Sequence, residues 1–356
     1  MIQRQLKLRL NNVQEQTLSG WLWHLTGVWN WAVRKIELDA KDGIFHTKKA
    51  FHNLLAGHGK TLGIPSHTLQ GTLSTAHTAW ERCVKKLAKR PKLKGRRNQL
   101  NSIPFPDPIR SPQDNHIMVP GLGAVRFHKP PLPTGKIKSG RIVKRASGWY
   151  LCLFIDAEPN AIAITASGQV GIDPGFKDLL TLSTGQKIPH PRELEQTAAR
   201  LAQAQRGGNT HLAARLQERL ANQRKDRNHK LSRDLVSQFE VIAFSKDNHR
   251  AIARTFGKSV ASSSHGQLRS MLAYKCRAGG RQFIEADSRN STRTCSACGA
   301  LAGPAGYAGL SVRQWTCTAC GADHDRDVNA AVNTLIAGVG MPLERHREVT
   351  PGIPRL

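Results

Sequence analysis

Two Cys-x-x-Cys pairs near the end of the chain are the strongest constraint on its fold. Cys295 and Cys298 lie in CSAC, Cys317 and Cys320 lie in CTAC, and 18 residues separate the two pairs. This spacing is typical of a zinc site in which four thiolates complete a tetrahedral shell. Because that shell leaves no open coordination position, we expect a structural Zn²⁺ ion. Free thiols and disulfides are the alternatives.

The chain also carries a large excess of positive charge. Its 53 Lys and Arg residues outnumber 25 Asp and Glu residues, which gives a formal charge of +28. A polyanion would relieve the resulting self-repulsion and release its condensed counterions. The sequence therefore predicts a nucleic-acid partner. A membrane surface is the weaker alternative because the charge is spread along the chain, and no stretch has the roughly 20 apolar residues of a membrane helix.

Two segments concentrate the basic residues. The run at 85–97 contains no acid and holds Lys85, Lys86, Lys89, Arg90, Lys92, Lys94, Arg96 and Arg97. A helix predicted from Leu212 to about Phe239 has leucines on its inner side, and its outer side carries Arg215, Arg219, Arg224, Lys225, Arg227, Lys230 and Arg233. A charge run is usually a solvated face, but the lack of compensating acids favours contacts with phosphates.

The N-terminal part combines strand and helix patterns. Period-two alternation predicts a strand at 5–10, and helical spacing runs from Asn12 to about residue 87. Between about 101 and 158, alternating segments and prolines indicate further strands, with a hairpin around Ala146 to Gly148. These strands and the first one are predicted to close one small β-barrel that holds the helical block as an insertion.

Four tryptophans lie early in the helical block, at Trp21, Trp23, Trp29 and Trp31. They accompany an apolar stripe with helical spacing, which is typical of a buried helix face. We therefore expect them to be core residues; platforms for stacking nucleic-acid bases are the alternative.

The C-terminal part has the element order of an α/β ribonuclease H-like domain. Three short strands are predicted at 169–190, followed by two helices broken at RGGNT. A fourth strand follows at 239–244, then a helix in HGQLRSMLAYK and a fifth strand at 281–287. A last helix lies in DRDVNAAVNTLIAG. In such domains an Asp on the first strand and an Asp at the last helix converge on paired Mg²⁺ ions.

Acidic residues occupy both of these places. Asp173 follows the strand-like run QVGI and precedes a Pro-Gly turn, so it is either a turn-former or a metal ligand. Asp323, Asp325 and Asp327 precede the last helix. Capping that helix requires one acid, either Asp325 or Asp327, and the surplus indicates a divalent metal with hard oxygen ligands.

Together, GIDPG, the cysteine pairs and DRDVNAAVN resemble the TnpB family, transposon-encoded RNA-guided nucleases related to type V CRISPR effectors. The likeness covers nearly the whole chain, including WLWHLTGVWNWAV and GWYLCLFID. It implies a wedge barrel formed by residues 1–11 and 98–165, a helical recognition domain at 12–97, a RuvC-like nuclease domain at 166–345 with a zinc ribbon at 290–324, and a flexible tail at 346–356.

The resemblance implies an RNA-guided DNA endonuclease with a two-metal mechanism. A transposon-derived RNA would guide it to double-stranded DNA targets that lie next to a short motif. Asp173 matches the first catalytic aspartate and Asp327 the last, each as a Mg²⁺ ligand, and the four cysteines match the zinc ribbon. A prokaryotic, cytoplasmic and nucleoid-associated protein is expected, and a monomer is favoured although the sequence does not give the oligomeric state.

One position departs from the family pattern. Most relatives have a glutamate at the end of the fourth strand, where this chain has Ser245, and a hydroxyl cannot replace a carboxylate at a Mg²⁺ site without loss of charge. We predict that Glu285, near the end of the fifth strand and two residues before Asp287, fills this place as a catalytic residue. A salt bridge from Glu285 to a nearby Arg is the alternative, and Asp247 is the next candidate.

Two other functions are alternatives, and Ser245 favours the first of them. A nuclease-dead, RNA-guided DNA-binding protein would act as a repressor by occupying its target. A DNA-joining transposase on the same ribonuclease H scaffold is the third possibility, although the zinc ribbon and the overall resemblance speak against it.

Overall fold

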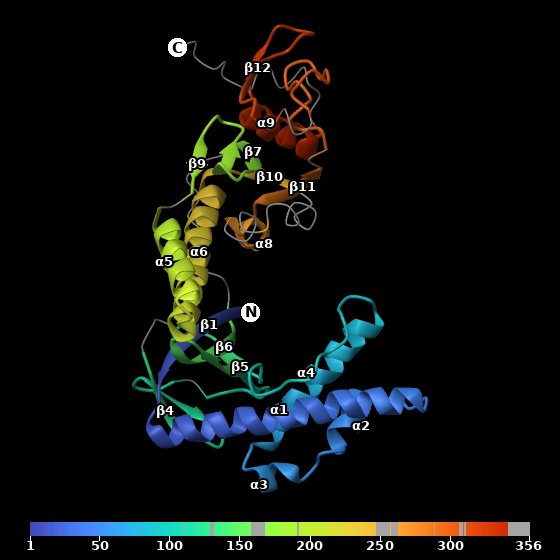
Figure 1. Cartoon of the computed structure of the whole chain (residues 1–356), viewed down its shortest axis with the longest axis vertical. Coiled ribbons are helices and arrows are strands. Elements are labelled where there is room, and N and C mark those ends of the chain that lie inside the picture. The colour runs from blue at the N-terminus through green and yellow to red at the C-terminus, as the bar shows by residue number, and fades with distance from the viewer. Residues whose placement is uncertain are drawn as a thin grey trace. The chain divides into compact units, whose positions relative to one another are not determined.

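In the computed structural model, the chain forms two compact units, Met1–Pro159 and Asn160–Leu356 (Figure 1). The structure describes residues 1–110, 112–128, 132–157, 168–190, 192–246, 257, 263–287, 289–305, 309 and 311–340. The expected domain boundary at 165/166 and the expected tail at 346–356 lie outside these residues.

Six antiparallel strands of the first unit form one sheet, in the order β2-β5-β6-β1-β4-β3. Their bounds are β1 (Ile2–Arg9), β2 (Ser102–Phe105), β3 (His116–Val119), β4 (Gly123–Phe127), β5 (Lys136–Arg145) and β6 (Gly148–Asp156). The predicted hairpin is confirmed, because β5 ends at Arg145 opposite Gly148 of β6. The predicted barrel is observed as an open sheet: over the described residues, the end strands β2 and β3 have four residues each and do not pair with one another.

Helices fill the interval between β1 and β2, as predicted. They are α1 (Asn12–Lys41), α2 (Lys48–Asn53), α3 (His58–Leu62) and α4 (Ser66–Val84). A capping box starts α1: Asn11 accepts a hydrogen bond from the backbone N–H of Gln14, and the Gln14 side chain accepts one from the backbone N–H of Asn11. None of the helices that the structure describes is long and apolar enough to cross a membrane.

The tryptophans of α1 divide into two groups. Trp21 and Trp29 are buried and donate their ring N–H groups to backbone carbonyls, and Trp31 is partly buried. The prediction of a core position is wrong for Trp23, which is 56% exposed. Successive helical residues are rotated by about 100°, so Trp23 projects away from the stripe that contains the buried Leu22.

Five strands of the second unit form a sheet in the order β11-β10-β7-β8-β9. Their bounds are β7 (Gln169–Pro174), β8 (Asp178–Leu182), β9 (Lys187–Pro189), β10 (Val241–Lys246) and β11 (Gln282–Asp287). β10 pairs in parallel with both β7 and β11, whereas β8 pairs antiparallel with β7 and β9. The predicted three strands in series and the predicted fourth and fifth strands are therefore present.

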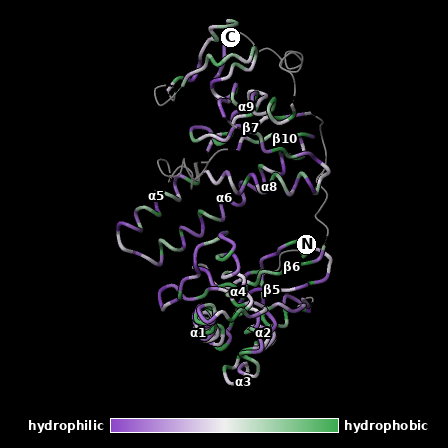
Figure 2. The backbone as a smooth tube through the Cα atoms, turned by 90° about the vertical axis from the view of Figure 1, so that its right-hand side faces the viewer, coloured by the Kyte–Doolittle hydropathy of each residue, from purple (hydrophilic) through white to green (hydrophobic). Residues whose placement is uncertain are grey.

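Helices cover both faces of this sheet (Figure 1). α5 (Arg192–Arg206) and α6 (Thr210–Gln238) pack against each other, and Figure 2 shows much hydrophilic colouring along them. α8 (His265–Ala278) packs against α6 and β11, and Ile172 and Phe244 are buried in the core on this side. α9 (Arg326–Val339) crosses β7, β10 and β11 on the other face.

The close approach of α9 shows which strand residues face it. A Cβ atom on Gly171 would lie 2.0 Å from the carbonyl oxygen of Ala331, so a larger residue there would displace the helix. Gly338 of α9 lies over Ala243 in the same way, with 2.7 Å from its would-be Cβ to the Cβ of Ala243. Because side chains alternate along a strand, residues 173 and 245 share this face with Gly171 and Ala243.

Candidate functional site

Asp173 lies in a row of residues that crosses the sheet of the second unit beneath α9. It is paired with Thr181 of β8, and Thr181 is paired with Lys187 of β9. Asp173 is half-buried and Thr181 is buried. The strand register thus places the predicted metal ligand on the face that α9 covers.

Ser245 continues the row on the other side of Asp173. The parallel pairing of β10 with β7 reaches Phe244 opposite Ile172, so the next residues along, Ser245 and Asp173, are level. Ser245 is buried and is paired in turn with Ala286 of β11. Over these strands the row therefore contains a single carboxylate, flanked by the hydroxyl groups of Ser245 and Thr181.

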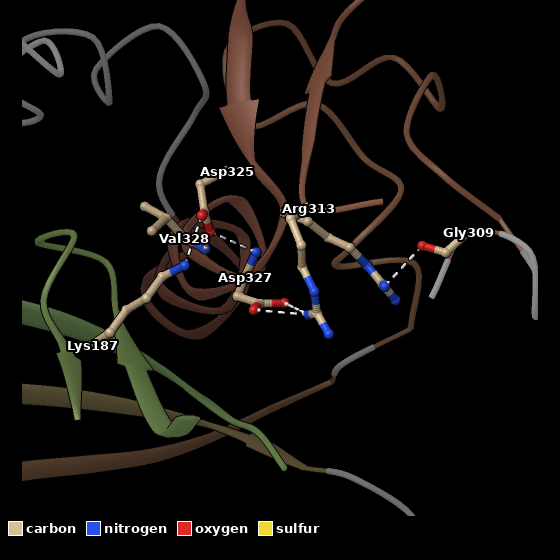
Figure 3. Close-up of polar contacts among 7 residues, drawn as sticks. Lys187, Gly309, Arg313, Asp325, Asp327 and Val328 are labelled. Carbon is tan, nitrogen blue, oxygen red and sulfur yellow. Dashed lines mark hydrogen bonds and ion pairs between the residues drawn. The ribbon is translucent and has the colours of Figure 1, made fainter. Parts of the chain in front are cut away.

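The N-terminus of α9 brings two more carboxylates to this side of the sheet (Figure 3). Asp325 is the N-cap: it accepts hydrogen bonds from the backbone N–H groups of Asp327 and Val328. Its other oxygen lies 2.7 Å from Nζ of Lys187, the last residue of the Asp173 row. Since Asp325 caps the helix, Asp327 has no capping role; its carboxylate lies 3.2 Å from Nη1 of Arg313.

These contacts determine the ionisation of Asp325. Burial alone would raise the pKa of this carboxyl group, but the hydrogen bond from Lys187 and those from the N–H groups of Val328 and Asp327 outweigh it and lower the pKa. The sequence pattern revealed neither Lys187 nor Arg313 as a partner. Lys187 is 138 residues away from Asp325 in the chain, and Arg313 is separated from Asp327 by a loop of the cysteine ribbon. The carboxylates of Asp173, Asp325 and Asp327 are not gathered into one cluster. Among the described residues, the four cysteines are the only group in which three or more His, Cys, Asp or Glu side chains come close enough to hold one metal ion.

Glu285 lies on the opposite face of the sheet, which overturns the reason for placing it in the catalytic site. It is paired with Phe244, whose ring is buried on the side of α6 and α8. Its carboxylate lies 3.5 Å from Nε of Arg269 in α8, the salt-bridge alternative considered above. Asp287, two residues further along β11, lies on the same face as Glu285, and Asp247 lies outside the described residues. The residue that stands beside Ser245 is Ala286.

We therefore expect Glu285→Gln to cleave DNA at the wild-type rate, within about twofold. Its partner Arg269 is partly exposed, and such ion pairs contribute about 0–1 kcal/mol to stability, so the fold should also be kept. The measurement is single-turnover cleavage, with Arg269→Gln as the matched variant. A large loss of cleavage in Glu285→Gln alone would return this residue to the active site.

The four cysteines are gathered closely enough to hold a metal ion. The Sγ atoms of Cys295 and Cys320 are 3.7 Å apart, and so are those of Cys298 and Cys317. All four sulfur atoms lie within 4.8 Å of one another. A tetrahedron with Zn–S distances of about 2.3 Å has edges of about 3.8 Å, so the donor set fits Zn²⁺.

Matching turns position the two cysteine pairs. The N–H of Gly299 donates to the carbonyl of Cys295, and the N–H of Gly321 donates to that of Cys317. Both glycines have left-handed backbones, with φ of +82° and +73°, which a side chain would disfavour. The strands β12 (Gln314–Thr316) and β13 (Asp323–Asp325) pair within this ribbon and lead directly into α9.

The pKa values of two of these thiols, Cys295 and Cys317, are shifted in opposite directions. Burial raises the pKa of Cys295 to about 12. Burial also acts on Cys317, but hydrogen bonds from the backbone N–H groups of Ala319 and Cys320 lower its pKa to about 7. His324, which the sequence reasoning missed, has Nε2 at 3.0 Å from Sγ of Cys295. Four thiolates this close together would repel one another, and a bound Zn²⁺ would offset that repulsion.

Two asparagines dock the ribbon onto α9. The Asn329 side chain accepts a hydrogen bond from the N–H of Ser296 at 2.9 Å and donates to the carbonyl of Thr294 at 2.8 Å. Asn333 donates to Thr294 at 2.6 Å and to Ser291 at 2.8 Å. Asn329 is two residues from Asp327, so the helix that carries Asp327 also holds the segment that contains Cys295. In the sequence, the two asparagines of NAAVN are four residues apart, a spacing that could have indicated a polar contact on one face of the last helix.

The predicted nucleic-acid contacts lie in two settings. On α6, Arg215, Arg219, Lys225 and Arg233 are exposed. Arg227 instead points inward: its guanidinium donates to the side chains of Asn228 and Ser264 and to the carbonyl of Ser263, and burial lowers its pKa to about 10.

The run at 85–97 follows α4 and is attached to α1. Asn30 binds both backbone groups of Lys94, donating to its carbonyl at 2.8 Å and accepting from its N–H at 2.7 Å. Arg90 forms an ion pair with Glu37. The backbone of this run is therefore held in place while most of its side chains remain exposed.

Comparisons with known proteins agree with these features. Residues 163–246 match the OrfB IS605 family, described as "Probable transposase", and residues 265–334 match "Cas12f1-like, TNB domain". A "Putative RNA-guided DNA endonuclease" of Streptomyces pristinaespiralis is 33% identical over 297 residues, which are 78% of this chain and 72% of that protein. InsQ of Escherichia coli K12, with the same description, is 25% identical over 304 residues, 77% of this chain and 75% of that one.

A solved structure, the Cas12f1-sgRNA-target DNA complex, aligns with 94% of this chain and 99% of that chain at 16% identity, and its TM-score of 0.38 is too low to show a common fold. The sequence relatives show the family. Because one third of the aligned residues are identical over most of both lengths in the Streptomyces relative, and further relatives are named TnpB-like proteins, the chain belongs to the TnpB family.

Proposed function

We propose that this protein is an RNA-guided DNA endonuclease whose second unit is a RuvC-like, ribonuclease H-like nuclease domain. The main support is the place of Asp173: it lies on the first strand of a five-stranded sheet, on the face crossed by the last helix, which carries Asp327. The sheet order β9-β8-β7-β10-β11, with only β8 antiparallel to its neighbours, is the order expected of this class.

The donor groups around Asp173 are all oxygen atoms, which suits Mg²⁺. Asp173 and Asp327 would hold the metal, and bound Mg²⁺ would activate water and stabilise the leaving 3′ oxygen. Lys187 fixes Asp325 at the start of α9 and so sets the position of the turn that carries Asp327. Nη1 of Arg313 lies 3.2 Å from the Asp327 carboxylate and neutralises its charge. A metal bound by Asp327 would have to replace part of this ion pair.

We infer that guide RNA and double-stranded target DNA are the partners. The excess positive charge suits two nucleic-acid strands, and exposed basic residues on α6 and in the run at 85–97 offer phosphate contacts. Pairing with the guide would read the target sequence, while the protein reads a short adjacent motif and the shape of the heteroduplex. Such a protein would work in the cytoplasm, at the nucleoid.

One experiment tests this function. The RNA that copurifies with the full chain is sequenced, and the complex is then incubated with Mg²⁺ and a plasmid that carries the matching sequence beside a library of flanking motifs. Guided cleavage is the expected result. Tight guided binding without cleavage would instead select the repressor alternative. The absence of copurifying RNA would overturn the proposal.

The basic face of α6 yields a quantitative prediction. Replacing the exposed Arg215, Arg219 and Arg233 with Gln should flatten the slope of log K against log salt by about 2.1 to 2.7, from about 0.7 per phosphate contact with single strands and 0.9 with duplex DNA. The matched control replaces the same three residues with Lys and should keep the slope. An unchanged slope in the Gln variant would mean that the phosphates are bound elsewhere.

A further inference from the structure

A cavity beside α1 in the first unit has a volume of about 430 Å³, within the range of small-ligand sites. The α1 residues that line it include Trp23, Gly27 and Trp31, which follow one another at intervals of four. Lys94 and Arg96 of the basic run form another part of its wall. The cavity therefore combines aromatic surface with two cationic side chains.

The two indoles differ in how firmly they are held. Trp31 stacks on Phe51, with 5.9 Å between ring centroids and 20° between the planes, and Phe51 is completely buried. Trp23 is 56% exposed, so most of its ring is available to a ligand. An exposed indole next to a fixed one resembles the stacking surfaces that bind unpaired bases.

Gly27 has no evident packing role. It lies inside α1, where glycine destabilises a helix relative to alanine, and it has no positive φ. An added Cβ would meet no heavy atom within 4 Å. A Cβ atom therefore has room at this position, and the glycine keeps the space between Trp23 and Trp31 open.

The cationic wall is built into the fold. Asn30 holds both backbone groups of Lys94, and the ring N–H of Trp29 donates to the carbonyl of Lys92 at 3.1 Å. In the described part of the chain, no Asp or Glu lines the cavity, and neither Lys94 nor Arg96 has an ion-pair partner. An anionic ligand with an apolar ring fits this combination.

We propose that the cavity receives an unpaired nucleobase of the guide RNA, stacked on Trp23, with an adjacent phosphate at Lys94 and Arg96. The inference rests on the proposed function. Bases of duplex DNA are stacked inside the helix, whereas RNA presents unpaired bases in loops, bulges and ends, and proteins bind these on aromatic side chains. The site would thus fix one nucleotide of the guide on the helical block.

Three variants test the proposal: Trp23→Ala removes the stacking surface, Trp23→Phe retains one, and Gly27→Leu places a bulky side chain between Trp23 and Trp31. Gly27→Leu should keep or raise the melting temperature, since Leu is the better helix former and an added Cβ meets open space. Trp23→Ala and Gly27→Leu should weaken binding of the sequenced, copurified RNA by about 5- to 150-fold, the range for loss of one stacked base, while Trp23→Phe stays within a few-fold of wild type.

Probing of 2′-hydroxyl reactivity on each RNA complex supplies a second measurement. One unpaired nucleotide protected in the wild-type complex should become reactive in Trp23→Ala and Gly27→Leu and stay protected in Trp23→Phe. If RNA copurifies with all variants and the profiles and affinities are unchanged, this inference is wrong while the proposed function stands. Loss of target-DNA binding alone, with an unchanged RNA profile, would also overturn it. A wild-type protein without RNA would refute the proposed function itself.

Discussion

Asp173→Asn is expected to abolish cleavage of matched DNA and to leave guided binding intact. The substitution preserves size, so the pairing of β7 with β8 and β10 should be kept. It removes the negative charge from the only carboxylate that the described strands place in the row beneath α9. Metal ions contribute several kcal/mol to transition-state stabilisation, and about 4 kcal/mol corresponds to a loss of about 10³-fold.

Single-turnover rates and dissociation constants for the same plasmid target separate the two effects. Glu285→Gln is the matched control, because it neutralises a nearby carboxylate on the opposite face of the sheet. Wild-type cleavage by Asp173→Asn would show that this residue is a turn-former, the alternative that its Pro-Gly neighbour permits. Equal losses of cleavage and binding would show that the variant disturbs the fold and not the chemistry alone.

The sequence could predict those parts of the site that depend on spacing. Cysteine pairs separated by 18 residues led to the cluster of four sulfur atoms, because two short turns suffice to gather the ligands. Strand and helix periodicity predicted the order in which β7 and α9 occur, and this order placed Asp173 on a strand crossed by the helix that carries Asp327.

The sequence could not determine which face of the sheet a strand residue occupies, because that requires the strand register to be known to the residue. Glu285 lies close to the predicted strand end, yet a shift of one residue reverses the face, and the register puts Ala286 beside Ser245. Arg227 shows the same limit on a helix. Leucines suggested the inner side of α6, but a buried polar network that includes Asn228 draws this arginine inward. Such contacts depend on residues far away in the sequence.

Removal of the zinc site should have the second large effect. We expect Cys317→Ser to lower the zinc content from one ion per chain to a small fraction, because a serine hydroxyl is a poor substitute for a thiolate. Structural zinc contributes about 10–16 kcal/mol of binding free energy in zinc-finger peptides. The melting temperature should therefore fall markedly. Cys83→Ser is the control, since Cys83 lies outside the cluster and should keep both zinc and stability.

The same variant should also lose cleavage, although no cysteine belongs to the Asp173 row beneath α9. The ribbon is held on α9 by hydrogen bonds from Asn329 and Asn333 to Thr294, next to Cys295, and Asp327 lies half a turn before Asn329. When the thiolate cluster opens, these contacts lose their fixed partner and the first turn of α9 loses its orientation over β7. Asn329→Ala isolates this step: it should retain zinc but cleave more slowly. A Cys317→Ser protein that lacks zinc yet melts and cleaves like wild type would show that the metal is not structural.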